Sequence, residues 1–145
     1  MILDYETCQK IMDSYKGIIT EREPIGWTAN EKLPIRHFTL GSGPKQVVVT
    51  GGQHANEIIT VTFIIELMNY LSKNNIVFED LTIHFIPMLN PEGYVVISSA
   101  IKEKLGKNST DSEKIRFCFD YYKAFRNDTI CLLYTSPSPR DISGS

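Results

Sequence analysis

A strand, a helix and a second strand follow one another in the middle of the chain, and this order constrains the fold more than any other feature. Residues 46–50 form a compact β-branched run, typical of a strand buried on both faces. Residues 58–71 carry apolar side chains at helical spacing, and residues 81–89 are again almost entirely apolar. A unit of this length predicts two parallel strands. We therefore expect an α/β fold with a mixed, largely parallel twisted sheet and helices on both faces.

Further elements are expected on either side of this unit. Residues 5–16 favour a short helix, and residues 25–40 favour a hairpin with its turn at residues 28–31. Residues 116–125 favour a helix, whereas residues 102–111 are typical of a solvated loop or a helix end. With 42% apolar residues in 145, the chain can bury the core of one domain.

Charge and hydropathy exclude several classes of function. The net charge of -2 and the absence of a basic stripe argue against nucleic acid as a partner. No segment reaches the roughly 18 consecutive apolar residues that span a bilayer, so we expect no membrane association. The polar start, Met1 to Lys16, does not resemble a signal peptide, so a cytoplasmic location is expected. The three cysteines are widely spaced and indicate neither a disulfide framework nor a cysteine zinc site.

The last fifteen residues differ abruptly in composition from the rest. Residues 131–141 read Cys-Leu-Leu-Tyr-Thr-Ser-Pro-Ser-Pro-Arg-Asp and resemble the translation of a transposase adapter. We therefore expect native sequence over residues 1–130 and a non-native tail over residues 131–145. A Ser/Pro-rich disordered terminus is the alternative interpretation.

Two candidate metal ligands follow the first of the two strands. Gly51 and Gly52 allow a sharp turn at the strand end, and His54 and Glu57 come directly after it. A histidine nitrogen and a carboxylate oxygen three residues apart can face one side where a loop curls into a helix, and both are ligands that suit Zn²⁺. The alternative is a chance pair in which Glu57 only favours the start of a helix.

The surrounding residues make the pair more specific. The segment 51–57, Gly-Gly-Gln-His-Ala-Asn-Glu, resembles the first zinc motif of the zinc carboxypeptidase family, the carboxypeptidase A-like metallopeptidases. Residues 90–94, Asn-Pro-Glu-Gly-Tyr, resemble the Asn-Pro-Asp-Gly-Tyr turn of that family, with Glu92 in place of aspartate. Residues 25–35 also resemble the hairpin that precedes the first motif. The resemblance covers residues 24–94, and it implies an N-terminal part of a metallocarboxypeptidase catalytic domain.

The resemblance implies a peptidase that uses one zinc ion and a metal-activated water on a peptide substrate. His54 and Glu57 would be two zinc ligands, and Arg126 is a candidate for stabilising the developing oxyanion, with Arg116 as its rival; a surface charge is the alternative for both. The family pattern also calls for a second histidine ligand, a glutamate base and an Asn-Arg pair, none of which is found here. We therefore expect the chain as written to be inactive.

The remaining histidines and cysteines are weaker candidates. His84 lies inside the second apolar run and is expected to be a satisfied core or helix-packed residue. His37 has no suitable partner nearby in the sequence, and Cys8 and Cys118 lack basic neighbours that would activate a thiolate.

Three other functions remain open. The first is a zinc-dependent deacylase that resembles succinylglutamate desuccinylase and aspartoacylase, which share the fold and a Gly-x-His-x-x-Glu signature. The second is an endopeptidase or amidase acting on cell-wall γ-glutamyl peptides. The third is a non-catalytic binding module on the same scaffold.

Overall fold

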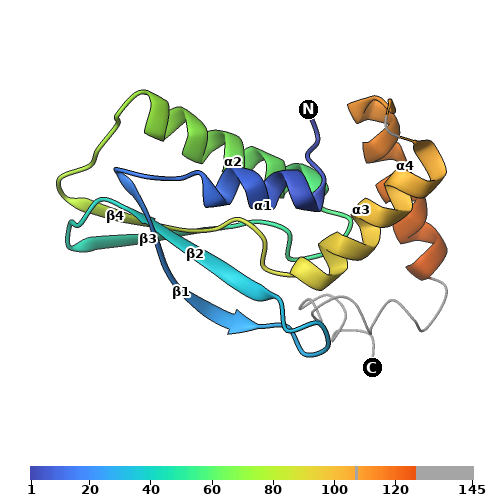
Figure 1. Ribbon diagram of the computed structural model, residues 1–145, viewed down its shortest axis with the longest axis horizontal. Helices are drawn as coiled ribbons and strands as arrows, with labels where there is room; N and C mark the ends of the chain where they lie inside the picture. The colour runs from blue at the N-terminus through green and yellow to red at the C-terminus, as the bar shows by residue number, and fades with distance from the viewer. Residues whose placement is uncertain (107, 127–145) are drawn as a thin grey trace.

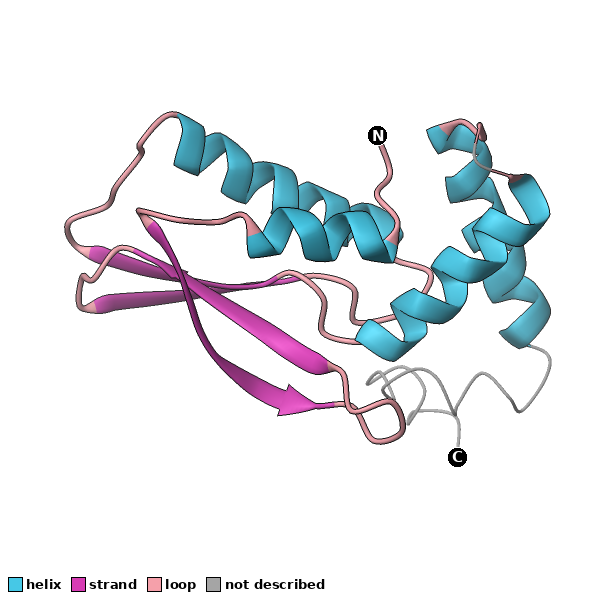
Figure 2. Cartoon of the chain, viewed as in Figure 1, coloured by secondary structure: helices cyan, strands magenta, loops and turns pink. Residues whose placement is uncertain are grey.

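The computed structural model describes residues 1–106 and 108–126, which form a mixed α/β fold of four helices and four strands (Figures 1 and 2). The elements in chain order are α1 (Tyr5–Asp13), β1 (Ile19–Trp27), β2 (Pro34–Leu40), β3 (Lys45–Thr50), α2 (Ile58–Lys73), β4 (Leu81–Ile86), α3 (Pro91–Leu105) and α4 (Asp111–Arg126). The expected tail, residues 131–145, lies outside the described residues.

The four strands form one mixed sheet in the order β1-β2-β4-β3. The central prediction is confirmed, because β3 and β4 are adjacent and parallel, from the pair Lys45 and Leu81 to the pair Thr50 and Ile86. The hairpin of β1 and β2 joins the sheet through antiparallel pairing of β2 with β4. Both parallel strands therefore end at the same edge of the sheet, where the loops after Thr50 and Ile86 begin.

The mixed α/β class is confirmed, but the sheet differs from the expectation in two details. In the described part of the chain only the β3–β4 pairing is parallel, because the hairpin adds two antiparallel pairings. Helices α1 and α2 lie on the same side of the sheet, and no described helix crosses the opposite face (Figure 1). Within the described residues the sheet is therefore mixed, with one parallel and two antiparallel pairings.

Strand β3 is one of the two edge strands of this sheet as described and, contrary to the prediction from its composition, is not buried on both faces. Val47 and Val48 are 43% and 61% exposed. Composition did not reveal this position, because a β-branched run fits any pleated surface and strand order is decided by the pairing of distant segments.

The hydrophobic core lies between the sheet and the helices. Its largest buried side chains include Tyr94 of α3, Phe38 of β2, Phe85 of β4 and Met12 of α1. The hydroxyl group of Tyr94 donates a hydrogen bond of 2.7 Å to the carbonyl oxygen of Leu3, which ties the start of the chain to α3. None of the helices in the described residues is long and apolar enough to cross a membrane.

Helix α3 begins where the sequence predicted a turn. The side chain of Asn90 accepts a hydrogen bond of 2.9 Å from the amide of Gly93, and Pro91 occupies the first helical position. Asparagine as N-cap followed by proline is a favoured helix start, although Asn-Pro is also a common turn pair. Of the two expectations for residues 102–111, a loop or a helix end, the helix end holds for the first part, since α3 continues to Leu105.

Helix α4 also begins earlier than predicted, at Asp111 instead of residue 116. The amide of Thr110 donates to the carboxylate of Glu113 at 2.7 Å, and the amide of Glu113 donates to the hydroxyl group of Thr110 at 3.3 Å. These reciprocal bonds form a capping box, which was visible in the sequence as Thr110-x-x-Glu113.

A line of polar side chains crosses the sheet face that no described helix covers. The rings of His37 on β2 and His84 on β4 meet edge to edge, with His37 Nε2 and His84 Nδ1 2.9 Å apart and ring centroids 5.1 Å apart. His84 Nε2 lies 2.6 Å from the Oε1 atom of Gln46 on β3. Because two facing nitrogens share one proton in such a bond, adding a proton to both rings would break it.

This pair predicts that stability falls in mildly acidic solution. Burial lowers the pKa of His37, and the neighbouring His84 and Arg22 lower it further. A histidine whose pKa is lower in the folded state opposes folding as it becomes protonated, so stability should fall as the pH drops below about 6.5. Urea midpoints at pH 7.5 and 6.0 should differ more for the unaltered protein than for His37→Asn. Equal pH dependence in the two proteins would contradict this.

Candidate metal centre

The bend after β3 requires both glycines of the segment 51–57. A Cβ atom on Gly51 would lie 2.8 Å from the side chain of Ile64 and 3.0 Å from the carbonyl oxygens of Thr60 and Pro87. Gly52 has a φ angle of +58°, and a Cβ atom there would lie 2.6 Å from Val61. Only glycine fits at these two positions, so the sharp turn predicted at the strand end has a steric cause.

Thr60 joins this bend to the start of α2. Its hydroxyl group accepts a hydrogen bond of 2.9 Å from the amide of Gly52 and donates one of 2.7 Å to the carbonyl oxygen of Glu57. The residues between Gly52 and Glu57, which include His54, therefore form a short loop whose two ends are held by one side chain.

The loop after β4 lies directly against the loop after β3. The amides of Leu89 and Asn90 donate hydrogen bonds of 2.8 and 2.9 Å to the carbonyl oxygens of Gly51 and Gly52. A Cβ atom on Gly93 would lie 2.9 Å from the Cβ atom of Ala55, so glycine at this position allows close contact of the two loops. The two sequence motifs, 51–57 and 90–94, thus form one structural unit at the edge where the parallel strands end.

His54 and Glu57 project from this unit as neighbours. Both are half-buried, and the Oε2 atom of Glu57 accepts a hydrogen bond of 3.2 Å from the backbone amide of His54. The amide of Glu57 in turn donates to the carbonyl oxygen of His54 at 3.1 Å. Glu57 immediately precedes α2, and its side chain does not cap that helix. The carboxylate is therefore folded back toward the backbone of His54.

The side chains of His54 and Glu57 are of the types that bind zinc, but two ligands are fewer than a catalytic zinc site has. One imidazole and one carboxylate are ligands that Zn²⁺ accepts, and a catalytic zinc site has three protein ligands. Among residues 1–106 and 108–126, no group of three or more histidine, cysteine, aspartate or glutamate side chains is placed to hold a metal ion. The described residues thus contribute two ligands at most.

The other sequence candidates lie elsewhere in the fold. His84 and His37 bond to each other on the open face of the sheet. His84 is thus satisfied but is not packed in the core or against a helix, and sequence reasoning missed its partner 47 residues away. Arg126 is the last residue of α4, and its role remains untested. Arg116 lies on the surface of α4, 86% exposed and 3.8 Å from Asp120, so a surface charge describes it well.

The two cysteines in the described residues are buried and unreactive in character. Burial raises the pKa of both the Cys8 and the Cys118 thiol to about 12. This agrees with the expectation that neither forms an activated thiolate.

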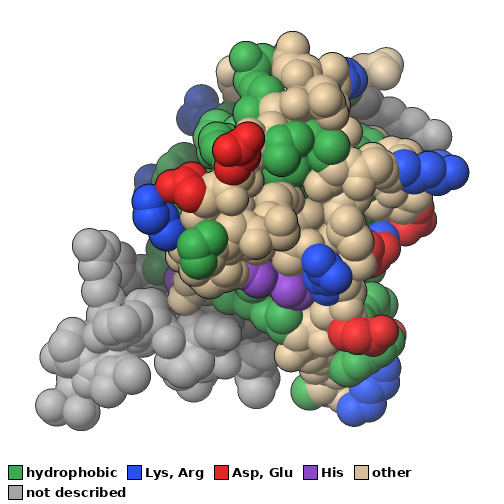
Figure 3. Space-filling model, turned by 90° about the vertical axis from the view of Figure 1, so that its left-hand side faces the viewer, with side chains coloured by type: hydrophobic (Ala, Val, Ile, Leu, Met, Phe, Trp, Pro, Cys, Tyr) green, Lys and Arg blue, Asp and Glu red, His purple; other side chains and the backbone are tan. Residues whose placement is uncertain are grey.

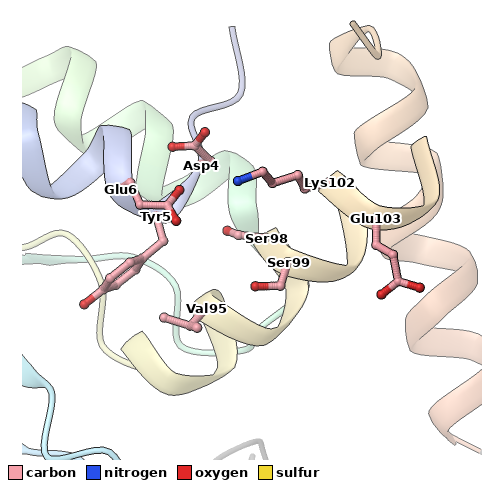
Figure 4. Close-up of a pocket in the computed structure, with 8 residues that line it drawn as sticks. All are labelled: Asp4, Tyr5, Glu6, Val95, Ser98, Ser99, Lys102 and Glu103. Carbon is pink, nitrogen blue, oxygen red and sulfur yellow. The ribbon is translucent and has the colours of Figure 1, made fainter. Parts of the chain in front are cut away.

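A separate pocket lies between the start of α1 and the outer face of α3 (Figure 4). Its lining mixes acidic, basic and hydroxyl side chains: Asp4, Tyr5, Glu6, Ser98, Ser99, Lys102 and Glu103, together with Val95. The carboxylate of Asp4 accepts a hydrogen bond from the amide of Thr7 and caps α1. The pocket contains neither His54 nor Glu57 and is not part of the candidate metal centre.

The sequence profile of the family described as zinc carboxypeptidase matches residues 5–128 of the chain. The match includes both loops of the candidate centre and nearly all of the described structure. The chain belongs to the zinc carboxypeptidase family. The family is zinc-dependent by description, and this agrees with the resemblance seen in the two motifs. No curated protein shows significant sequence similarity to the chain.

Solved zinc carboxypeptidases share the fold. A metallo-carboxypeptidase from Burkholderia cenocepacia is 18% identical with a TM-score of 0.56, over 86% of this chain and 38% of the other. Bovine thrombin-activatable fibrinolysis inhibitor, in complex with tick carboxypeptidase inhibitor, is 16% identical with a TM-score of 0.51, over 73% of this chain and 35% of the other. The chain therefore spans less than two fifths of the length of these proteins.

Thr60 provides a test of how the zinc carboxypeptidase loop is held. Thr60→Val keeps the shape of the side chain but removes the hydroxyl group, so the amide of Gly52 and the carbonyl oxygen of Glu57 lose their partner. We expect a loss of about 1–3 kcal/mol in the free energy of unfolding, measured by urea denaturation. Thr60→Ser retains the hydroxyl group and should lose less than half as much. Equal losses in both variants would show that the hydrogen bonds contribute little.

Proposed function

We propose that this chain forms part of a zinc-dependent peptidase that removes residues from the C-terminus of peptides. The observation that carries the proposal is the position of His54 and Glu57, which lie in one loop where the amide of His54 donates to the Glu57 carboxylate. The amide of Asn90 donates a hydrogen bond to Gly52 at the start of this loop. In open sheets, ligands bind beyond the carboxyl ends of parallel strands, and this is where the pair lies.

In this proposal His54 and Glu57 are two ligands of one zinc ion. A zinc ion in such a site would lower the pKa of a water molecule toward about 7 and polarise the carbonyl group of the scissile bond. The chain's own contribution is orientation: Thr60 and the two glycines hold the loop, and the amide of His54 holds the Glu57 carboxylate. Arg126 is proposed to stabilise the developing negative charge.

The two ligands predict how this 145-residue chain behaves with zinc. Two protein ligands do not complete a catalytic zinc site, so we expect weak zinc binding and no hydrolysis by the chain alone. Equilibrium dialysis against zinc measures this directly. Tight binding of one ion per chain would contradict the expectation and would point to a third ligand within these residues.

Peptide substrates are favoured over N-acyl amino acids by the sequence of the two loops. Ala55, which contacts Gly93, and the Asn-Pro-Glu-Gly-Tyr turn resemble the peptidase pattern more than that of the deacylases. The deacylase remains the second candidate because it shares the Gly-x-His-x-x-Glu signature.

The test begins with the source gene. Its reading frame should be determined beyond residue 130, and the protein that it encodes, called the extended protein below, should be purified with zinc. We expect hydrolysis of N-blocked dipeptides with a free C-terminal carboxylate and none of the same peptides with an amidated C-terminus. Hydrolysis only of N-acetylaspartate or succinylglutamate would favour a deacylase. A frame without a second histidine and a glutamate base would favour a non-catalytic module.

A further inference from the structure

One side chain connects the first turn of α3 to the tip of the β1–β2 hairpin. The Oε1 atom of Glu92 accepts hydrogen bonds from the amides of Asn30 at 2.9 Å and Glu31 at 2.6 Å. Its Oε2 atom accepts a third from the side-chain amide of Asn30 at 3.2 Å. These residues are more than sixty positions apart in the sequence, so Glu92 makes a long-range contact and not a local cap.

The hairpin tip is a closed turn that offers these amides as a group. The amide of Thr28 donates to the carbonyl oxygen of Leu33, and the amide of Leu33 donates to the hydroxyl group of Thr28, both at 2.9 Å. Lys32 adopts a positive φ angle of 53°. Successive amides that point to one side form a small anion-binding concavity, and the carboxylate of Glu92 occupies it through charge-assisted bonds.

The turn is thereby joined to the candidate metal centre. Glu92 lies between Asn90, whose amide bonds to Gly52, and Gly93, which contacts Ala55 in the loop that carries His54. Figure 1 shows the β1–β2 turn beside the start of α3, at the same end of the sheet as the loops after β3 and β4. A short path of bonded residues thus runs from the turn through Glu92 to the His54 loop.

We propose that Glu92 is a positioning residue whose hydrogen bonds to Asn30 and Glu31, called the latch below, hold the 28–33 turn in place. The turn held in this way forms a fixed edge, called the rim below, of the peptide site. The inference rests on the proposed function for the identity of the substrate, but the latch itself does not. A fixed rim limits how a peptide can approach the metal pair, so its expected effect is on substrate binding and not on the chemical step.

The length of the side chain is essential to the latch. Aspartate, which the Asn-Pro-Asp-Gly-Tyr pattern has at this position, is one methylene shorter and would not bring a carboxylate oxygen to the backbone amides of Asn30 and Glu31. Glutamine keeps the length and one acceptor oxygen for these two amides, but it removes the charge and places a donor group opposite the side-chain amide of Asn30. Aspartate should therefore release the turn, and glutamine should weaken the contact by a smaller amount.

Amide hydrogen exchange on the purified chain tests the latch without reference to catalysis. In Glu92→Asp, exchange at the amides of Asn30 and Glu31 should rise at least tenfold, with a smaller rise in Glu92→Gln, while the core amide of Ile64 stays protected. Glu103→Gln is the matched control, because Glu103 lies on the same helix and its carboxylate is 2.9 Å from the Nζ atom of its neighbour Lys104. Unchanged exchange at residues 30 and 31 would overturn the latch.

A pH titration of the amide chemical shifts of residues 30 and 31 gives a second test of the latch. Hydrogen bonds from the turn lower the pKa of Glu92, with the side chain of Thr28 and the amide of Glu31 as the leading causes. The latch should therefore be closed at neutral pH and open as the pH falls through this lowered pKa. The amide shifts of residues 30 and 31 should follow that titration and should be flat in Glu92→Gln. The turn also carries the charged side chains of Glu31 and Lys32, which both variants retain.

The extended protein tests the role of the rim. Glu92→Asp should raise KM at least threefold and leave kcat within twofold, because the turn acts on binding. An unchanged KM would overturn the rim role. If exchange confirms the latch but the extended protein hydrolyses no peptide, the proposed function fails and the latch stands.

Discussion

Gly43→Ala should strongly destabilise the fold, although it adds a single methyl group in the short connection between β2 and β3, where Gly43 is buried. A Cβ atom at Gly43 would overlap the backbone of Asp80 and Leu81 at the start of β4. The clash is with main-chain atoms, so no side-chain rotation relieves it. The carbonyl oxygen of Gly43 also accepts hydrogen bonds from Thr82 and Gln46, which fix its position.

Relief of this clash would require β3 and β4 to separate, and their parallel pairing starts at this point. We expect the free energy of unfolding to fall by more than about 4 kcal/mol, a loss that only a few kinds of substitution cause. A typical domain has a total stability of about 5–15 kcal/mol, so a large part of it would be lost. Circular dichroism and urea denaturation measure the outcome. Gly26→Ala is the matched control, because the nearest atom to its Cβ lies at 3.8 Å. A Gly43→Ala protein with an unaltered urea midpoint would contradict the steric argument.

His54→Ala should remove zinc and peptidase activity from the extended protein. Loss of a partner outside the ligand shell already costs about 10–100-fold in metal affinity or activity, so loss of a ligand should cost more than about 100-fold in kcat/KM. Glu57→Gln should have a similar effect, because it removes the negative charge that the metal needs. The fold should persist in both variants, since each side chain is half-buried and lies outside the core.

His84→Ala is the control for this prediction. It also removes one histidine, but from the open face of the sheet, where histidines reach the surface beside hydrophobic and charged side chains (Figure 3). It should retain zinc and activity within about threefold, as surface substitutions away from a site usually change little. Equal loss of zinc from His54→Ala and His84→Ala would show that the metal is not held by the loop after β3.

The sequence predicted the part of the fold that depends on local pattern. The β3–α2–β4 unit was recognisable because residues 46–50 are a β-branched run, residues 81–89 are almost entirely apolar, and residues 58–71 have helical periodicity. The glycine pair after β3 was recognised as a sharp turn, and the structure explains it by contacts with Ile64 and Val61. His54 and Glu57 were found from spacing and from the resemblance of their surroundings to a known motif.

Features that depend on distant pairing were not predictable in this way. The edge position of β3 follows from the strand order, which the composition of Val47 and Val48 does not encode. The bond between His37 and His84 follows from the register of β2 and β4. Glu92 was noticed only as a replacement for aspartate, whereas its role depends on the hairpin tip more than sixty residues earlier.

The start of α3 is a different kind of error, because the signal was local and was misinterpreted. Asn90-Pro91 predicts either a turn or a helix start, and the residues after Tyr94 show weak apolar periodicity. The N-cap role of Asn90 and the acidic side chain of Glu92 in the first turn would have favoured the helix. Capping signals along the whole chain, read as helix starts, predict both α3 and α4.

Anomalous diffraction from crystals of the extended protein, recorded above and below the zinc absorption edge, tests the central claim most directly. The account predicts one zinc peak, about 2.0–2.2 Å from a ring nitrogen of His54 and a carboxylate oxygen of Glu57. A zinc peak bound by other side chains, or none near these two in crystals grown with zinc, would contradict the assignment of His54 and Glu57 as metal ligands.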